Sequence, residues 1–179
     1  MVLPERFARV RVSDLHPDTL LTEVTRDYLQ HFWEAFDAGV APVFVGRPGT
    51  GKTTAAAVVA RYAWQVGDVD TEFVVVPDLT AQIEFDRFSE ETRARLLRLR
   101  DVPLLVLDDA HVIPNAQSAS AAALTSVVSA RWNARRPTLW TANFDLQAGR
   151  EWAVIYRHFG PVLGRRIEDG SAGYRVLLT

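Results

Sequence analysis

Short, continuously apolar runs alternate along the chain with longer segments in which apolar positions recur at helical spacing. The apolar runs predict buried strands at 41–46, 72–76, 103–109, 137–143 and 174–179. The periodic segments predict helices at 17–38, 51–66, 89–100 and 116–134. Continuously apolar strands that alternate with helices are typical of a parallel sheet covered on both faces. The predicted fold is therefore α/β, with a five-stranded parallel sheet between helices.

The ends of two predicted helices carry the signals expected of helix termini. Pro17 suits the first turn of the helix at 17–38, and Gly39 suits its stop. The helix at 89–100 has acids in its first turn and arginines in its last, as the helix dipole favours.

The segment GPVLGRRIEDGSAGYR at 160–175 has a different composition and places arginines among glycines. We expect these glycines to let a short segment of the chain turn.

Length and composition narrow the class of protein. A chain of 179 residues suits one domain over 1–179, in which residues 1–40 form a segment and helix packed on the core. The net charge of −2 argues against a strong general affinity for nucleic acid, so any such contact is expected to be local. The chain has no cysteine, which excludes disulfides and thiolate metal sites. No signal-like or membrane-spanning stretch is seen, and we expect a cytoplasmic protein without membrane contact.

The segment GRPGTGKTT at 46–54 matches the P-loop pattern that binds nucleoside triphosphates. Its glycines let the backbone curl so that several N–H groups point at one phosphate chain, and the following helix directs its positive end at the same anion. Lys52 is expected to reach the β and γ phosphates, and the Thr53 hydroxyl to ligate Mg²⁺. The residues predicted to bind the nucleotide here are Gly46, Pro48, Gly49, Thr50, Gly51, Lys52, Thr53 and Thr54.

Polar residues end two of the predicted strands. Asp108 follows the apolar run LLVL and is expected to hold the Mg²⁺ shell beside the phosphates. Asp109 stands where many P-loop ATPases have a glutamate that polarises the attacking water, and its side chain is one methylene shorter. Asn143 ends TLWTAN and is expected to orient water against the γ-phosphate. The alternative for Asp108 and Asp109 is a strand that simply ends in solvated acids, and the alternative for Asn143 is an asparagine that favours a turn.

These motifs, in this order, resemble the AAA+ ATPases of the DnaC/IstB type. The P-loop, VPDL, LLVLDD, VVSARW, RRPTLWTAN and the closing GRRI…GYR cover nearly the whole chain. The resemblance implies an AAA+ P-loop fold without a C-terminal lid domain, and ATP and Mg²⁺ as cofactors. It implies an ATPase that acts in DNA replication as a helicase loader, of bacterial or phage type. The implied partners are a replicative ring helicase, single-stranded DNA and further copies of the same chain.

The resemblance also assigns roles to several residues outside the P-loop. Arg166 matches the arginine finger that one subunit places against the γ-phosphate of the next, with Arg165 as a substitute candidate. Arg175 matches an arginine near the last strand that senses the nucleotide. Arg131 matches a recurrent arginine of the family and is a candidate for the subunit boundary, and Phe7 is expected near the adenine. The alternative for the terminal arginines is a solvated basic loop paired with acids of the same segment.

Other functions remain open at this point. Transposition helper ATPases that assemble on duplex DNA share the same core. A small nucleotide-dependent kinase has a suitable size and P-loop, but it requires an arginine-bearing lid that the sequence does not offer. A nucleotide-gated binding module with slow turnover is consistent with Asp109. Loaders of this type usually carry an additional N-terminal segment for the helicase, and only about 40 residues precede the P-loop here.

Overall fold

A computed structural model describes residues 3–113, 118–146 and 148–178 of the chain. Within them five strands form one sheet in the order β2-β3-β4-β1-β5, and every neighbouring pair is parallel. The strands are β1 Val43–Gly46, β2 Thr71–Val75, β3 Leu104–Asp108, β4 Thr138–Asn143 and β5 Arg175–Leu177. The predicted five-stranded parallel sheet is confirmed. The first two residues of the predicted helix at 116–134, and Thr179 of the last predicted strand, lie outside the described residues.

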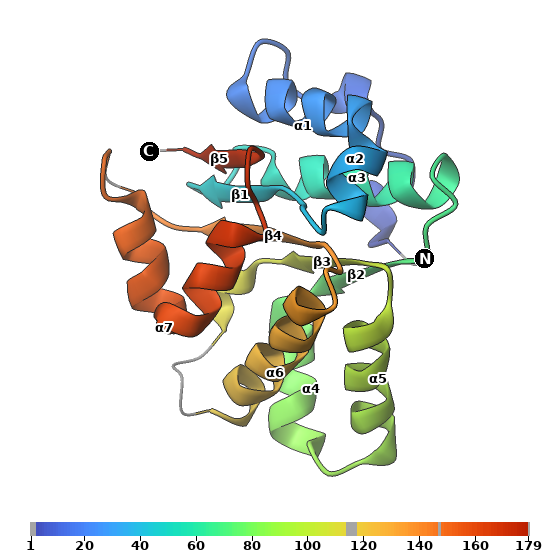
Figure 1. The fold of residues 1–179 in the computed structure, drawn as a ribbon, viewed down its shortest axis with the longest axis vertical. Helices are drawn as coiled ribbons and strands as arrows, with labels where there is room; N and C mark the ends of the chain where they lie inside the picture. The colour runs from blue at the N-terminus through green and yellow to red at the C-terminus, as the bar shows by residue number, and fades with distance from the viewer. Residues whose placement is uncertain (1–2, 114–117, 147, 179) are drawn as a thin grey trace.

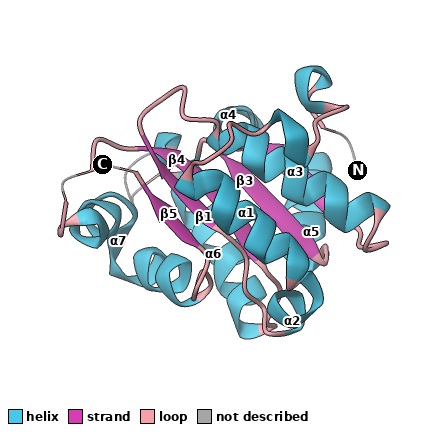
Figure 2. Cartoon of the chain, turned by 90° about the horizontal axis from the view of Figure 1, so that it is seen from above, coloured by secondary structure: helices cyan, strands magenta, loops and turns pink. Residues whose placement is uncertain are grey.

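Helices cover both faces of the sheet, as Figures 1 and 2 show. On one face lie α1 Leu20–Gln30, α2 Phe32–Asp37 and α3 Lys52–Gln65. On the other lie α4 Val76–Asp86, α5 Glu90–Asp101, α6 Ala119–Asn133 and α7 Glu151–Asp169. Short 3₁₀ turns occur at Glu5–Phe7, Val12–Asp14 and Ala110–Val112. Each layer buries its own apolar cluster against the sheet, so the strands are apolar on both faces, which explains their continuous apolar runs.

The N-terminal segment packs on the core through aromatic side chains. Tyr28 and Phe32 are fully buried or nearly so, and Phe7 shares their apolar cluster with the alanine-rich side of α3. The predicted single helix at 17–38 is wrong in detail. Helix α1 begins at Leu20, because Thr19 accepts a hydrogen bond from the Thr22 amide and caps it. Pro17 therefore precedes the helix, and non-helical backbone at His31 separates α1 from α2.

Two helices were not predicted. In α4 the apolar run of β2 continues without a break into the helix, and Pro77 in its first turn is a typical helix-starting residue. In α7 the glycines and Pro161 suggested a turning segment, and this expectation is corrected. The helix tolerates them because Gly160 leaves the helical conformation (φ 76°, ψ 166°) and kinks the chain directly before Pro161. Arg165 and Arg166 thus stand on a helix and not in a glycine-framed loop.

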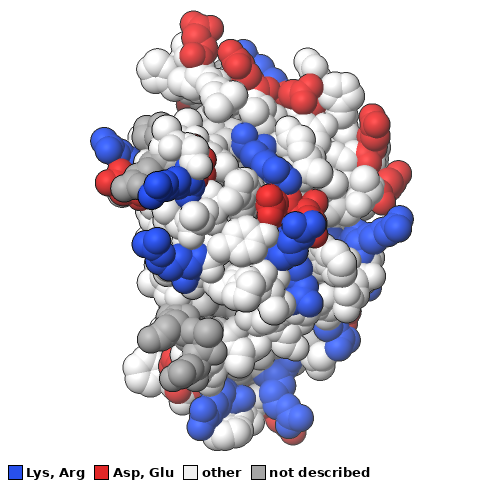
Figure 3. All heavy atoms as spheres, turned by 60° about the vertical axis from the view of Figure 1, so that its left-hand side comes forward, with Lys and Arg blue, Asp and Glu red and all other residues white. Residues whose placement is uncertain are grey.

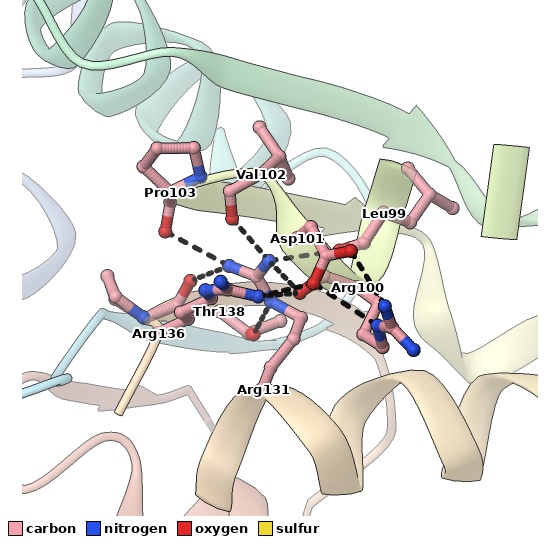
Figure 4. Close-up of polar contacts among 9 residues, drawn as sticks. Leu99, Arg100, Asp101, Val102, Pro103, Arg131, Arg136 and Thr138 are labelled. Atoms are coloured by element: carbon pink, nitrogen blue, oxygen red, sulfur yellow. Dashed lines mark hydrogen bonds and ion pairs between the residues drawn. The ribbon is translucent and has the colours of Figure 1, made fainter. Parts of the chain in front are cut away.

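Arg131 is a structural residue of the interior and does not lie at a subunit boundary. Its side chain is 0 % exposed and points from α6 toward the chain segment that enters β3 (Figure 4). Its guanidinium donates to the Thr138 hydroxyl and to backbone carbonyls of Leu99, Arg100, Val102, Pro103 and Pro137. Burial lowers the pKa of Arg131 to about 9. A buried guanidinium with this many acceptors ties α5, α6 and the starts of β3 and β4 together.

Candidate nucleotide-binding site

The P-loop joins β1 to α3, and its backbone conformation depends on glycine. Gly49 and Gly51 have φ values of +81° and +89°, a region that other residues rarely adopt. Gly46 is closed in, since a Cβ atom there would lie 2.6 Å from Cβ of Leu178. Gly51 is the N-cap of α3, so the amino end of this 14-residue helix opens directly into the loop. The segment thus forms the phosphate cradle that the sequence motif predicts.

Lys52 directs its ammonium back into the loop. Its Nζ donates to the Arg47 carbonyl at 2.7 Å and to the Thr50 hydroxyl at 3.2 Å, and the residue is 5 % exposed. Burial lowers the pKa of Lys52, while the carboxylates of Asp108 and Asp109 act in the opposite direction. A phosphate in the loop offers this ammonium stronger, charged acceptors than the carbonyl and hydroxyl it now contacts.

Asp108 is held at the end of β3 by a hydroxyl group of β4. The Thr141 hydroxyl donates to its Oδ1 at 2.6 Å. Asp108 is only 3 % exposed, and burial raises the pKa of its carboxyl, while the hydroxyls of Thr141 and Thr53 act in the opposite direction. A buried carboxylate without a cationic partner is costly. Its charge and its place next to Thr53 fit a divalent cation, and Thr53 and Asp108 are the residues that would hold Mg²⁺.

Asp109 and Asn143 meet at the carboxyl ends of β3 and β4. The Asn143 amide donates from Nδ2 to Oδ1 of Asp109 at 3.0 Å. Asp109 has left-handed backbone (φ 58°, ψ 40°), and its own amide donates to the Thr141 hydroxyl at 2.9 Å. Left-handed backbone in a non-glycine residue is uncommon and is often found at functional sites. Asn143 pairs with Gly46 across β1 and β4, so the amide and both acids stand beside the P-loop.

A cavity of about 420 Å³ lies beside the P-loop. Its lining includes Lys52, Thr53, Asp109 and Asn143, with Phe7 and Arg6 from the N-terminal segment on one side. A second, mainly apolar cavity of about 440 Å³ shares Gly49, Gly51 and Thr54 with the first and extends toward Leu15, His16, Leu21 and Leu178. Together the two cavities provide a polar part for phosphates and an apolar part for a nucleobase. The donors and carboxylates present therefore fit ATP with Mg²⁺.

The motifs did not point to Thr141, Arg6 or His111. Thr141 lies within the strand TLWTAN, and threonine is a common strand residue without a functional role. Arg6 stacks its guanidinium 4.4 Å from the centre of the Phe7 ring. His111 Nδ1 lies 4.0 Å from Oδ1 of Asp109 and has no hydrogen-bond partner among the residues described. Burial lowers the pKa of His111. The sequence signal that could have pointed to His111 is its position three residues after Asp108, the acid that ends β3.

Arg166 and Arg165 lie away from this cavity. Arg166 donates to the Ser129 hydroxyl, and its guanidinium lies 5.9 Å from the centre of the Trp132 ring. It lines a different cavity that also includes Thr138, at the beginning of β4. Arg165 is exposed and pairs with Asp169 at 3.0 Å. Neither arginine can therefore contact a nucleotide in the P-loop of its own subunit.

Arg175 is also outside the cavity at the P-loop, which corrects the expectation that it senses the nucleotide of its own subunit. It begins β5 opposite Val43, at the amino end of β1, whereas the P-loop follows the carboxyl end. Its guanidinium donates to the Glu168 carbonyl at 2.6 Å and lies 5.2 Å from the centre of the Trp152 ring. These contacts fix the turn between α7 and β5.

On the face that Figure 3 turns forward, basic and acidic side chains are interspersed. Among the residues described, no helix combines the length and apolar character needed to cross a bilayer.

Comparisons with known proteins agree with this site. The model of the family described as IstB-like ATP binding protein matches residues 36–158. None of the curated proteins matches the chain. A solved DnaC helicase loader is 20 % identical, with a TM-score of 0.81 over 97 % of this chain and 99 % of that one. A DnaI structure is 21 % identical, with a TM-score of 0.72 over 99 % of this chain and 92 % of that one.

A more distant likeness is to the replication initiator DnaA bound to AMPPCP and single-stranded DNA. It is 14 % identical, with a TM-score of 0.75 over 99 % of this chain and 51 % of that one. The structural likenesses establish the AAA+ P-loop fold, and the family model covers both the P-loop and the two strand ends that meet it. The chain therefore belongs to the family of IstB-like ATP-binding proteins.

Proposed function

We propose that the protein binds ATP and Mg²⁺ in the P-loop cavity and hydrolyses ATP there. The observation that carries the proposal is the convergence of Lys52, Thr53, Asp108, Asp109 and Asn143 at one edge of the sheet. Bound Mg²⁺ neutralises charge that develops on the β and γ phosphates. Lys52 exchanges its loop partners for phosphate oxygens, and Thr53 and Asp108 hold the ion.

In this proposal Asp109 is the base that accepts a proton from the attacking water. Asn143 keeps the carboxylate in place by donating to Oδ1, which leaves Oδ2 free to face the water. The Thr141 hydroxyl links the two acids, since it donates to Asp108 and accepts from the Asp109 amide. Phe7 and the apolar cavity beside Thr54 are the candidate walls for the adenine.

We further propose that residues 1–179 work as one ATPase domain that acts in DNA replication as a helicase loader. Support comes from the likeness to a DnaC helicase loader over nearly the whole of both chains. The DnaA likeness, to a protein bound to single-stranded DNA, supports single-stranded DNA as a partner. The replicative ring helicase and the homo-oligomer are expected from the same family resemblance.

Arg166 is proposed to act on the nucleotide of a neighbouring subunit. It lies at the amino edge of the sheet, on the opposite side from its own P-loop, so a role in ATP hydrolysis requires a second subunit. To reach a neighbouring phosphate, its guanidinium has to leave Ser129 and the Trp132 ring. An arginine supplied in this way contributes about 10³–10⁵ in rate in related phosphoryl-transfer enzymes.

The test is ATP turnover as a function of protein concentration, with and without single-stranded DNA. Wild type is compared with Arg166→Ala, with Lys52→Ala, and with Arg157→Ala, an exposed arginine of the same helix that serves as the matched control. We expect specific activity to rise with concentration and DNA to stimulate it. Arg166→Ala should abolish most turnover, and mixing it with Lys52→Ala should restore part of it.

Activity that is flat with concentration and indifferent to Arg166 would contradict action between subunits. If Arg165→Ala abolishes turnover and Arg166→Ala does not, the finger is Arg165. A pull-down with a ring helicase then tests the loader role, which fails if the protein neither binds the helicase nor changes its loading on DNA.

A transposition helper ATPase is the second candidate, because the matching family model is the IstB-like one. Ordered assembly on duplex DNA, seen by electron microscopy, would favour this candidate over the loader. Transfer of phosphate to a nucleoside or nucleotide in place of water would favour a kinase over both.

A further inference from the structure

A cavity of about 440 Å³ lies at the edge of the sheet opposite the P-loop. Its walls come from four parts of the chain: the turn that enters β1, the end of α6, the start of β4 and the end of α7. At about 3.3 Å per residue, the step from Thr138 to Asn143 along β4 puts roughly 17 Å between this cavity and the P-loop. The cavity is therefore distinct from the proposed ATP site.

The charges on its walls are strongly unequal. Three arginines line it, Arg135, Arg136 and Arg166, against the single carboxylate of Asp169. That carboxylate is already paired with Arg165 at 3.0 Å. An excess of guanidinium groups around a hollow favours an anionic ligand, and guanidinium matches the geometry of phosphate oxygens.

Two of the three guanidiniums are fixed before any ligand arrives. Arg136 donates from Nη1 to Oδ1 of Asp101 at 2.7 Å and to the Arg100 carbonyl at 3.0 Å (Figure 4). Arg166 donates from Nη1 to Ser129. Within the described part of the chain, the other N–H groups of both guanidiniums make no hydrogen bond. Donors held in place in this way lose little conformational entropy on binding.

Arg135 projects from a turn that the backbone itself constrains. Its φ is +52°, in the left-handed region, and the turn lies against the chain at Gly39. A Cβ atom on Gly39 would lie 2.8 Å from the Arg135 carbonyl oxygen, so only glycine permits this approach. Arg135 is exposed and makes no ion pair within the described part of the chain. A strained arginine without a partner, at the mouth of a cavity, is a candidate for ligand contact.

An aromatic surface accompanies the charges. The Trp132 ring lines the cavity and is 46 % exposed, and the Arg166 guanidinium lies 5.9 Å from its centre. An open indole face next to guanidinium groups accommodates a flat base attached to a phosphate. A volume of about 440 Å³ is sufficient for one nucleotide unit.

We infer that this cavity is a second site for a phosphorylated nucleoside, taken either as a free nucleotide or as one unit of a single-stranded nucleic acid. In this site Arg135 and Arg136 contact the phosphate and Trp132 carries the base. The inference is independent of ATP hydrolysis in the P-loop. It concerns the single subunit, in which Arg166 keeps its contact with Ser129.

The experiment measures binding at a protein concentration low enough to keep the chain monomeric, in a Lys52→Ala background that disables the P-loop. Two probes separate the sources: a fluorescent mant-ADP and a fluorescein-labelled dT12, both followed by anisotropy. Arg135→Gly is the test variant, because glycine suits the left-handed backbone and the fold is retained. Arg135→Lys keeps the charge, and Arg26→Ser removes an exposed arginine of α1 as the matched control.

We expect Arg135→Gly to weaken binding of at least one probe about tenfold, Arg135→Lys to weaken it less, and Arg26→Ser to leave it unchanged. Trp132→Ala should weaken the same probe. The probe that responds identifies the source of the ligand. The inference is overturned if neither probe binds, or if Arg135→Gly binds both as well as Arg26→Ser does. Because the P-loop is disabled throughout, failure here leaves the proposed ATPase untouched.

Discussion

Thr141 and Asp108 form a short hydrogen bond that spans two neighbouring strands, with the threonine hydroxyl donating to Oδ1 at 2.6 Å. The same hydroxyl accepts from the amide of Asp109 at 2.9 Å. One side chain of β4 therefore sets the orientation of both acids at the end of β3. This makes Thr141 a positioning residue for the proposed magnesium ligand and for the proposed base.

Thr141→Val removes that hydroxyl and keeps the shape of the side chain. We expect ATP turnover to fall about tenfold or more, and unfolding in urea to show a loss of about 1–3 kcal/mol, because a buried amide and a buried carboxylate lose their partner. Thr141→Ser, which retains the hydroxyl, is the control and should keep most of the turnover and most of the stability of the wild type. Equal turnover in the valine and serine variants would show that Thr141 does not position the acids.

Asp108→Asn is expected to stabilise the protein in the absence of nucleotide. Burial raises the pKa of Asp108 above its ordinary 3.8, so the folded state retains this proton to higher pH than the unfolded chain does. The wild type therefore loses stability as pH rises from 3.8 through the raised pKa, and the asparagine variant avoids this loss. The gain should be full at pH 7 and should shrink as pH falls through the folded pKa.

With nucleotide and Mg²⁺ added, the wild type should become more stable than Asp108→Asn. Ligand that binds the folded state stabilises it in proportion to its affinity, and Asp108→Asn removes a proposed ligand of the ion. Thermal unfolding with and without MgADP measures both effects. A variant that is less stable than wild type without ligand would contradict the desolvation argument.

The sequence was sufficient to predict the parallel sheet and the residues that meet at its carboxyl edge, for a physical reason. The five strands are buried on both faces, so each is a continuous apolar run, and parallel strands place their ends at one edge. Asp108 and Asn143 were therefore predictable as neighbours of the P-loop. The boundary between β2 and α4 was not, because the apolar run passes through it without a change in composition.

Tertiary contacts decided the elements that the sequence did not reveal. Helix α7 tolerates Gly160 and Pro161 because its kink falls between two segments that each bury apolar side chains, Ile155 before it and Leu163 after it. Thr141 looks like an ordinary strand residue until β3 supplies Asp108 beside it. Arg131 likewise acquires its role only when two chain segments, 99–103 and the residue before β4, place their carbonyls around its guanidinium.

Arg131→Met is expected to destabilise the fold by at least about 3 kcal/mol, since several buried carbonyls lose the guanidinium that donates to them. Urea unfolding measures this loss. Arg136→Met is the control. That arginine is part-exposed and pairs with Asp101, so its loss should cost about 1 kcal/mol or less. An Arg131→Met protein that unfolds like wild type would show that the guanidinium does not hold these chain segments together.

Gly160→Ala tests the kink in α7. Glycine here has φ 76° and ψ 166°, a conformation almost restricted to glycine, and a Cβ atom would meet nothing within 4 Å. The expected loss of about 1–3 kcal/mol is thus backbone strain alone, without a steric clash. Thermal unfolding measures it, and a change below about 0.5 kcal/mol would mean that the kink relaxes at little cost.

His158 gives the protein a specific sensitivity to acid. Its ring packs against Phe144 and Phe159, with centres 4.9 Å and 4.8 Å apart. The residue is exposed, but partial desolvation of the ring, followed by the nearby His111, lowers its pKa below the ordinary 6.5. The unfolded chain therefore takes up this proton more readily than the folded one, and stability falls as pH drops from 6.5 through the folded pKa.

His158→Phe keeps an aromatic ring in that cluster and removes the titrating group. We expect its unfolding free energy to decline slightly less steeply than that of wild type as pH falls from 6.5 through the folded pKa, since the imidazole is exposed and its desolvation only partial. His111 still titrates in this variant, and burial lowers its pKa as well, so part of the acid sensitivity should remain. Urea unfolding at several pH values measures the two slopes. Parallel curves would show that His158 binds its proton equally well in the folded and unfolded states.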